Sequence, residues 1–220
     1  MISALIFDWG GVIQRTASHE ARHGLDAQLG LAPGSVERAV FESDIWREAS
    51  VGRCDADVAW RAIVASLGWP AERVDEFVER FFAGDEVDPE LVACIRFWRT
   101  QGLKVGLLSN APPPWQVGAK HLPDDPAKVE SVNSQTLRPY NWGMDGLFDA
   151  QVFSYQVGAL KPDPRMYRAI LAALDVPAEE SLFIDDAPAN VLGALKAGMG
   201  AVRFVGVDAL LRHLACLGLP

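Results

Sequence analysis

Residues 4–11 of this 220-residue chain are Ala4-Leu-Ile-Phe-Asp8-Trp-Gly-Gly11, and they give the strongest indication of its fold. Its apolar run stops at a carboxylate, Asp8, and a pair of glycines follows one residue later. A short apolar run that ends in a turn is typical of a strand buried on both faces of a parallel sheet. We therefore predict a buried parallel strand that presents Asp8 at its carboxyl end.

Further apolar runs repeat this pattern. The run Lys104–Leu108 is followed by Ser109-Asn110, and the run Ser181–Ile184 is followed by Asp185-Asp186. Residues 150–153 are another candidate strand, and residues 201–204 are a weaker one.

Helical periodicity separates these strands. The segments 89–100 and 164–174 both begin with proline, which suits the first turn of a helix, and a third helical segment covers 189–197. Alternation of strands and helices is typical of a parallel sheet covered on both faces. We predict a doubly wound, mainly parallel α/β sheet.

Residues 16–84 differ from the rest of the chain, because they have helical periodicity, several turn signals and no clear strand. We predict a small helical cap domain over 16–84, inserted into an α/β core formed by residues 1–15 and 85–220. The segment 112–145 is rich in proline and shows little periodicity. A loop of that length in a compact domain is usually functional or disordered.

Composition excludes several classes of protein. The chain carries 20 basic and 29 acidic residues, a formal net charge of −9, so we expect no nucleic acid partner. The 3 cysteines are far apart and form no CxxC motif, which favours a reducing, cytoplasmic location. No apolar stretch is long enough for a membrane span, and the first apolar run lacks the basic leader of a signal peptide.

Polar residues follow three of the predicted strands: Asp8, Ser109-Asn110 and Asp185-Asp186. Ligands of open parallel sheets bind outside the carboxyl ends of the strands, so these residues are expected to converge. Neighbouring carboxylates disfavour one another's ionisation, and a hard divalent cation such as Mg²⁺ removes that cost. Lys161, beyond the strand at 150–153, is a candidate to neutralise an anionic substrate.

Four motifs, in order along the chain, resemble those of the haloacid dehalogenase superfamily, nearer its phosphatase-like members with a helical cap after the first motif. They are Phe7-Asp-Trp-Gly-Gly-Val-Ile13, Leu107-Leu-Ser-Asn110, Ser154–Gly158 running into Lys161-Pro-Asp-Pro164, and Phe183-Ile-Asp-Asp186 with Asn190. The resemblance covers nearly the whole chain, apart from parts of the cap and residues 112–145. It implies a Rossmann-like core and hydrolysis of a small phosphorylated molecule by a monomer or homodimer.

The resemblance also implies catalytic roles. Asp8 attacks the electrophile and forms a covalent aspartyl ester, which splits one hard displacement into two easier ones. The Ser109 hydroxyl and the Asn110 backbone N–H hold the oxygens of the transferred group. Lys161 offsets charge on Asp8 and on the substrate.

A metal site is implied by the same motifs. Asp185 and Asp186 hold Mg²⁺ together with Asp8 and the backbone carbonyl of Gly10. Around this site, Trp9, Gly10, Gly11 and Arg53 are the expected substrate-binding residues. Arg53 belongs to a turn in the cap that faces the core in capped members of the superfamily.

One position departs from the phosphatase pattern. Phosphatases of this superfamily carry a second Asp two residues after the nucleophile, which protonates the leaving oxygen and then activates water, and here that residue is Gly10. Three alternatives follow: a phosphatase for esters with good leaving groups, a proton donor elsewhere in the chain, or metal-independent C–halogen hydrolysis, which needs no acid. A non-catalytic binding protein on the same fold is a further alternative.

A second motif has no place in this scheme. His19-Glu-Ala-Arg-His23 matches the HExxH spacing of zinc proteases. No third ligand motif accompanies it, so we interpret the match as coincidence, although one of these histidines is a candidate to border the active site. Among the 7 tryptophans, Trp46, Trp60 and Trp98 are expected in the core, whereas Trp115 and Trp142 lie in the 112–145 segment.

Overall fold

A computed structural model describes residues 2–114 and 146–219. Its centre is a five-stranded sheet with the order β5-β4-β1-β6-β7, and every neighbouring pair runs parallel. All the predicted strands are present, as β1 (Ala4–Phe7), β4 (Lys104–Ser109), β5 (Ala150–Phe153), β6 (Ser181–Asp185) and β7 (Gly200–Arg203). The predicted fold class is confirmed.

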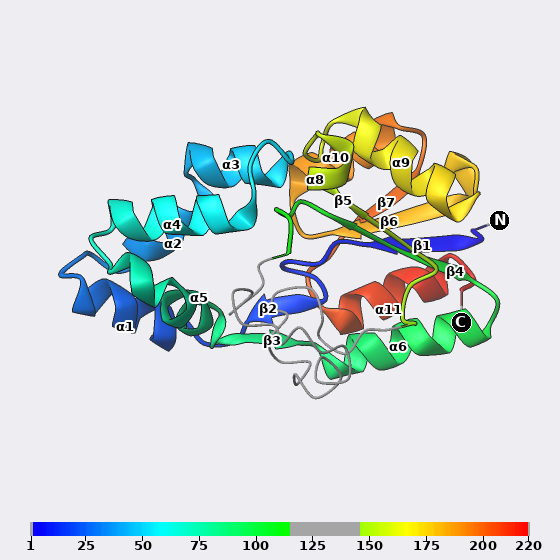
Figure 1. The fold of residues 1–220 in the computed structure, drawn as a ribbon. Helices are drawn as coiled ribbons and strands as arrows, with labels where there is room; N and C mark the ends of the chain where they lie inside the picture. The colour runs from blue at the N-terminus through cyan, green and yellow to red at the C-terminus, as the bar shows by residue number, and fades with distance from the viewer. Residues whose placement is uncertain (1, 115–145, 220) are drawn as a thin grey trace, which may run out of the picture.

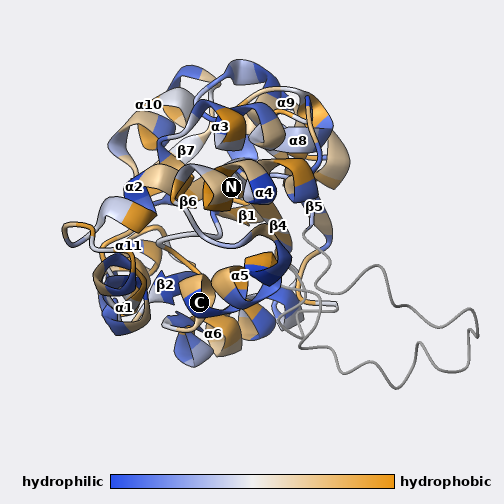
Figure 2. Cartoon of the chain, turned by 60° about the vertical axis from the view of Figure 1, so that its left-hand side comes forward, coloured by the Kyte–Doolittle hydropathy of each residue, from blue (hydrophilic) through white to orange (hydrophobic). Residues whose placement is uncertain are grey.

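Helices cover both faces of this sheet (Figure 1). On one face, α6 (Pro89–Thr100) and α11 (Val207–Cys216) bury Leu91, Trp98 and Leu210 against the strands. On the other face, α9 (Pro164–Leu174) and α10 (Pro188–Lys196) contribute a second core around Tyr167. Hydrophobic and hydrophilic residues alternate along outer helices such as α9 and α10 (Figure 2), as expected for helices that bury one side.

A second group of helices lies beyond the carboxyl ends of the strands (Figure 1). We call this group the cap; it consists of α1 (Glu20–Gln28), α2 (Ser35–Phe41), α3 (Asp44–Ser50), α4 (Ala56–Ser66) and α5 (Val74–Phe82). The cap has a hydrophobic cluster of its own, centred on Trp60, Phe77 and Phe81. Its helices fall within 16–84, and the domain boundaries at these residues stay a prediction.

Two short strands connect the cap to the core. β2 (Gln14–Thr16) and β3 (Asp85–Val87) pair antiparallel, whereas we predicted no strand near these positions. Each strand has only three residues, and all but Val87 are polar, so neither has a strand period that could be recognised in the sequence. The segments that enter and leave the cap lie very close together: a Cβ on Gly84 would be only 1.8 Å from the Ser18 carbonyl oxygen.

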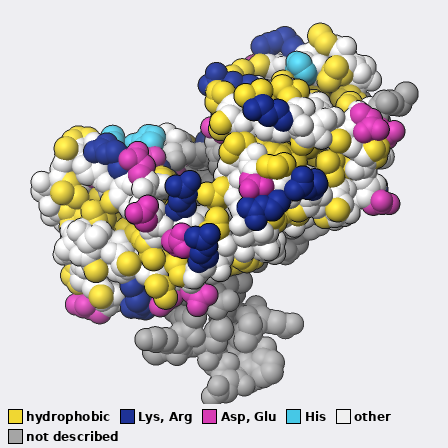
Figure 3. All heavy atoms as spheres, turned by 90° about the horizontal axis from the view of Figure 1, so that it is seen from above, with side chains coloured by type: hydrophobic (Ala, Val, Ile, Leu, Met, Phe, Trp, Pro, Cys, Tyr) yellow, Lys and Arg dark blue, Asp and Glu magenta, His cyan; other side chains and the backbone are white. Residues whose placement is uncertain are grey.

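The remaining features concern the surface. Basic and acidic side chains are interspersed over both lobes on the face shown in Figure 3. No helix among the described residues is long and apolar enough to cross a membrane. Most of the predicted 112–145 loop, with Trp115 and Trp142, lies outside the described residues.

Candidate active site

Asp8 stands at the carboxyl end of the central strand, as predicted. Its backbone N–H continues the ladder by donating to the Ile184 carbonyl (2.9 Å), so the position of the residue is fixed by β6. The side chain is buried, and its Oδ1 accepts the backbone N–H of Trp9 at 2.7 Å. The chain then turns sharply: the Trp9 carbonyl accepts the N–H groups of Ile13 and Gln14 at 2.9 and 3.0 Å.

Lys161 lies between two carboxylates. Its Nζ is 2.7 Å from Asp8 Oδ1 and 2.8 Å from Asp185 Oδ2, and its side chain is almost completely buried. A buried ammonium requires such partners, because an unpaired charge away from water costs several kcal/mol. The fold therefore brings Lys161 next to Asp8, although the two residues are 153 residues apart in the sequence.

Asp185 is fully buried and accepts hydrogen bonds on both oxygens. Oδ1 accepts the backbone N–H of Ala187 at 2.8 Å, and the Asn190 amide donates to both oxygens at 3.1 and 3.0 Å. Oδ2 also receives Lys161. Asn190 belonged to the fourth motif, but sequence reasoning gave it no role; the structure shows that it orients Asp185.

Asp186 completes a cluster of carboxylates. Oxygen atoms of Asp8, Asp185 and Asp186 all lie within 4.8 Å of one another. Asp186 sits directly over the glycine turn, since a Cβ on Gly11 would be 2.3 Å from Asp186 Oδ2. Gly11 also has a φ of +80°, so a side chain at this position is excluded both by space and by backbone conformation.

Burial and a neighbouring carboxylate raise the pKa values of two of these aspartates, Asp8 and Asp186. Burial, only partly offset by Lys161, raises the pKa of Asp8 to about 7, and the charge of Asp185 adds to the increase. Burial and the neighbouring Asp185 also raise the pKa of Asp186. One lysine therefore does not balance the cluster, whose electrostatics favour a further cation.

Ser109 and Asn110 end β4 beside this cluster. The Asn110 side chain accepts the Lys161 backbone N–H at 2.7 Å and donates to the Lys161 carbonyl at 3.2 Å. It therefore holds the lysine loop in place, a role that the sequence did not suggest. Ser109 is buried to 4% exposure and lines the adjoining cavity.

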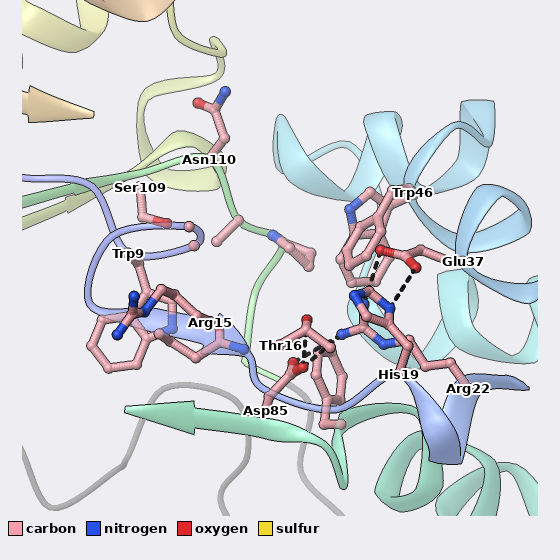
Figure 4. Close-up of a pocket in the computed structure, with 17 residues that line it drawn as sticks. Trp9, Arg15, Thr16, His19, Arg22, Glu37, Trp46, Asp85, Ser109 and Asn110 are labelled. Atoms are coloured by element: carbon pink, nitrogen blue, oxygen red, sulfur yellow. Dashed lines mark hydrogen bonds and ion pairs between the residues drawn. The ribbon is translucent and has the colours of Figure 1, made fainter. Parts of the chain in front are cut away.

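The cavity has a volume of about 510 Å³ and lies between the core loops and the cap. Trp9, Gly10, Gly11, Ser109 and Asn110 line it from the core. Figure 4 shows Trp9 and Ser109 on one side of it, and Trp46, Glu37 and His19 on the other. A carboxylate cluster with a paired lysine, next to a cavity of this size, is an arrangement suited to nucleophilic attack on an anionic substrate.

Comparison with known proteins identifies the family. The family model for haloacid dehalogenase-like hydrolases matches residues 2–198. The chain belongs to this family. The predicted family and the prediction that the chain is a hydrolase are both confirmed.

Several characterised relatives of this hydrolase are phosphatases by name. A phosphatase from Mycobacterium tuberculosis is 29% identical over 225 residues, covering 99% of this chain and 95% of its own. A sesquiterpene phosphatase from Aspergillus oryzae is 24% identical and covers 89% of this chain and 86% of its own. A phosphoserine phosphatase from Thermus thermophilus is 31% identical over 76% of this chain, which spans 64% of that protein.

Solved structures agree on the fold. A predicted hydrolase of this family from Porphyromonas gingivalis superposes with a TM-score of 0.69 at 24% identity, covering 97% of this chain and 98% of its own. A family enzyme from Bacteroides thetaiotaomicron, solved with magnesium and inorganic phosphate, gives a TM-score of 0.69 at 18% identity, covering 94% and 97%.

The substrate-binding predictions have different outcomes in this haloacid dehalogenase-like hydrolase. Trp9 and Gly10 line the cavity, as does His19 of the HExxH match. Arg53 is not among the cavity residues; its side chain is 69% exposed and pairs with Glu48 at 2.9 Å. The proposed contact of Arg53 with substrate stays a prediction. Of the described residues, only the three aspartates form a cluster suited to a metal.

Ser154 was missed as a structural link of the site. Its fully buried Oγ accepts the Ala111 N–H at 2.8 Å and lies 2.6 Å from the Ser50 carbonyl of the cap. The neighbouring cap turn packs so closely that a Cβ on Gly52 would be 2.3 Å from the Tyr155 carbonyl oxygen. A lone serine after a strand carries no sequence signal for such a contact.

Proposed function

We propose that this hydrolase is a Mg²⁺-dependent phosphatase that cleaves a small phosphomonoester through an aspartyl-phosphate on Asp8. The observation that carries the proposal is the position of Lys161 between Asp8 and Asp185. Asp186 lies close enough to these two aspartates for all three to contact one metal ion. The phosphatase activities named for the relatives support the same reaction class.

The three aspartates fit a divalent cation. Their oxygens lie within 4.8 Å of one another, and their charges exceed that of the single lysine. Asp185 already accepts hydrogen bonds on both oxygens, so we propose that Asp8 and Asp186 supply the direct ligands, with the Gly10 carbonyl beside them. When bound, Mg²⁺ would neutralise charge on the transferred phosphoryl group.

The chain's own residues provide the rest of the reaction. A carboxylate oxygen of Asp8 forms a bond to phosphorus as the bond from phosphorus to the alcohol oxygen breaks. Lys161 offsets the negative charge that accumulates on Asp8 and the phosphoryl oxygens. Ser109 and the Asn110 backbone N–H orient those oxygens. Water then attacks the phosphorus of the aspartyl-phosphate, which releases phosphate and restores Asp8.

The departing alcohol needs a proton, and Gly10 has no side chain that could donate one. General acid help is worth roughly 10²–10⁴-fold in rate. We therefore propose that the enzyme is fastest with esters whose leaving group needs no proton. The substrate is a small molecule, and the relatives leave its nature open because their names include both a polar and an apolar substrate.

The test is phosphate release by the purified protein from a panel of phosphomonoesters, with Mg²⁺ and with excess chelator. We expect turnover only with Mg²⁺, and loss of turnover in Asp8→Asn. Thermal unfolding checks that this variant folds like wild type, with Asp163→Asn, at the partly exposed N-cap of α9, as the control substitution.

Turnover that persists in Asp8→Asn would refute the proposed nucleophile. Halide release from a haloacid that continues after chelation would instead establish C–halogen hydrolysis. Asp8→Asn would abolish that activity as well, so dependence on Mg²⁺ is the measurement that separates the two reactions.

A further inference from the structure

The cavity next to Ser109 has an aromatic wall. Trp9 contributes from the core, and Phe41, Trp46 and Phe82 contribute from the cap. Phe41 is 46% exposed although it packs edge-on against Trp46, with ring centroids 5.8 Å apart. A large apolar side chain left exposed at a cavity is a feature of ligand-binding surfaces.

Each basic side chain that lines the same cavity has an acidic partner. Arg22 is buried and donates to Glu37 at 2.9 Å, to Asp85 at 2.8 Å and to the Phe81 carbonyl at 3.0 Å. The other basic side chains among the described cavity residues are also paired, His19 with Glu37 at 3.5 Å and Arg15 with Asp88. Figure 4 shows the pairs of Arg22 and His19 grouped at the lower edge of the cavity, below Trp46.

These pairings decide what the wall can recognise. A substrate with an ammonium or a carboxylate would have to break an existing pair or leave its own charge without a partner, and both are costly away from water. A hydrocarbon body would meet the aromatic rings without disturbing any pair, and it would gain from the removal of apolar surface from water. The wall therefore favours an apolar ligand.

We infer that the substrate is a phosphomonoester of an apolar alcohol, whose hydrocarbon body packs between Trp9 and the rings of the cap. The inference rests on the proposed phosphatase function and names the substrate class for the same site. The phosphate lies beside Ser109 and Asp8, and the chain of the alcohol extends toward Phe41 and Trp46.

The space beyond these rings suits an elongated body. A second cavity of about 390 Å³ shares Phe41, Trp46 and Asn110 with the first. The aromatic pair thus stands between two hollows that both reach the end of β4. Polar and charged residues form most of the second hollow, so an alkyl chain gains its apolar contact from the aromatic pair and from the first cavity.

Ethyl and octyl phosphate provide the test, because both are esters of primary alcohols with similar leaving groups. They are assayed with Mg²⁺, below the concentration at which octyl phosphate forms micelles, and O-phosphoserine serves as the charged comparison. Each buried methylene is worth about fourfold in affinity, so burial of half of the added chain predicts about a 50-fold higher kcat/KM for octyl phosphate. A ratio near one, or a preference for O-phosphoserine, would overturn the inference.

Variants locate the preference in the cap. Phe41→Ala and Trp46→Ala are each expected to lower the octyl-to-ethyl ratio of kcat/KM by about tenfold. The matched control is Phe97→Ala, because Phe97 is similarly exposed (48%) but lies on α6 of the core. An octyl preference that survives both cap substitutions would show that the chain binds elsewhere, which also overturns the inference.

A binding measurement keeps this inference separate from the proposed function. Octylphosphonate and ethylphosphonate resist hydrolysis, and calorimetry gives their affinities whether or not the protein turns over esters. Tighter binding of octylphosphonate that is lost in Phe41→Ala supports the apolar site even if no phosphatase activity is found. Mg²⁺-dependent hydrolysis with equal binding of both phosphonates would support the function and refute the substrate class.

Discussion

Replacement of Gly10 by aspartate tests how the missing acid limits this hydrolase. A Cβ at position 10 would have no atom within 4 Å, and the backbone there is outside the left-handed region that favours glycine. The residue is exposed and lines the cavity next to Ser109. The introduced carboxyl therefore has room to reach the leaving oxygen, and Gly10→Asp should fold normally.

The expected gain depends on the leaving group. For an alkyl phosphate, whose alcohol departs poorly without a proton, a general acid should raise kcat/KM by roughly 10²–10⁴-fold. This corresponds to a lower barrier by about 3–5 kcal/mol, at about 1.4 kcal/mol for each factor of ten. For a 4-nitrophenyl ester, whose leaving group needs no proton, we expect a change of less than about threefold.

The assay is kcat/KM over a series of phosphate esters with increasing leaving-group pKa. Wild type should show a steep decline along the series, and Gly10→Asp a shallow one. Gly10→Asn is the matched control, because it has nearly the same shape but transfers no proton. Equal behaviour of the Asp and Asn variants, or an equal gain for every ester, would refute the claim that the leaving group lacks an acid.

Three further predictions concern the metal cluster and the cap. Asp186→Asn should abolish the stabilisation that Mg²⁺ gives in thermal unfolding. The metal-free protein should keep its stability, because burial and Asp185 already disfavour the negative charge on the Asp186 carboxylate. A large loss of stability in the metal-free variant would contradict this prediction. The apparent Kd for Mg²⁺ should rise about tenfold for each pH unit below pH 7, because Asp8, with a pKa of about 7, must lose its proton to bind the ion. Calorimetry from pH 5 to 8 should show this rise at low pH and a constant Kd above the pKa. A Kd that does not change with pH would contradict the prediction. In urea unfolding, Gly52→Ala should destabilise the protein by about 1–3 kcal/mol more than Gly68→Ala. Gly68 is the matched control, because it has a similar positive φ but open space where the new methyl group would lie. Equal losses of stability would show that the contact of Gly52 with Tyr155 is unimportant.

The core of the site was predictable because parallel sheets place the carboxyl ends of their strands together. Asp8, Ser109 and Asp185 each follow an apolar run that is unmistakable in the sequence. Their convergence then follows from the strand order, in which β4 and β6 flank β1. Lys161 lies beyond the end of β5, which made it a candidate to neutralise an anionic substrate, whereas its role beside Asp8 depended on the resemblance to the family.

The contacts between cap and core were not predictable in the same way. Asp85 pairs with Arg22, which is 63 residues away, and nothing in either local sequence marks the other as a partner. Ser154 reaches Ser50 across a longer gap of 104 residues. Such pairs depend on how the cap is placed over the sheet, and periodicity reports only which face of a helix is buried. The same limit explains why Phe41, which lines the cavity, was not singled out from the sequence.

The charges on the two sides of the cavity are balanced to different extents. On the core side, three carboxylates outnumber one lysine, an imbalance that suits the divalent cation and the phosphate that we propose there. On the cap side, Arg22 is already held by Glu37 and Asp85, so little charge is left for recognition. A substrate that satisfies both sides is charged at one end and apolar at the other. The absence of an acid at position 10 does not affect this recognition, but it slows the step in which Asp8 attacks and the alcohol departs, so hydrolysis should be slow for an ester whose alcohol needs a proton to leave.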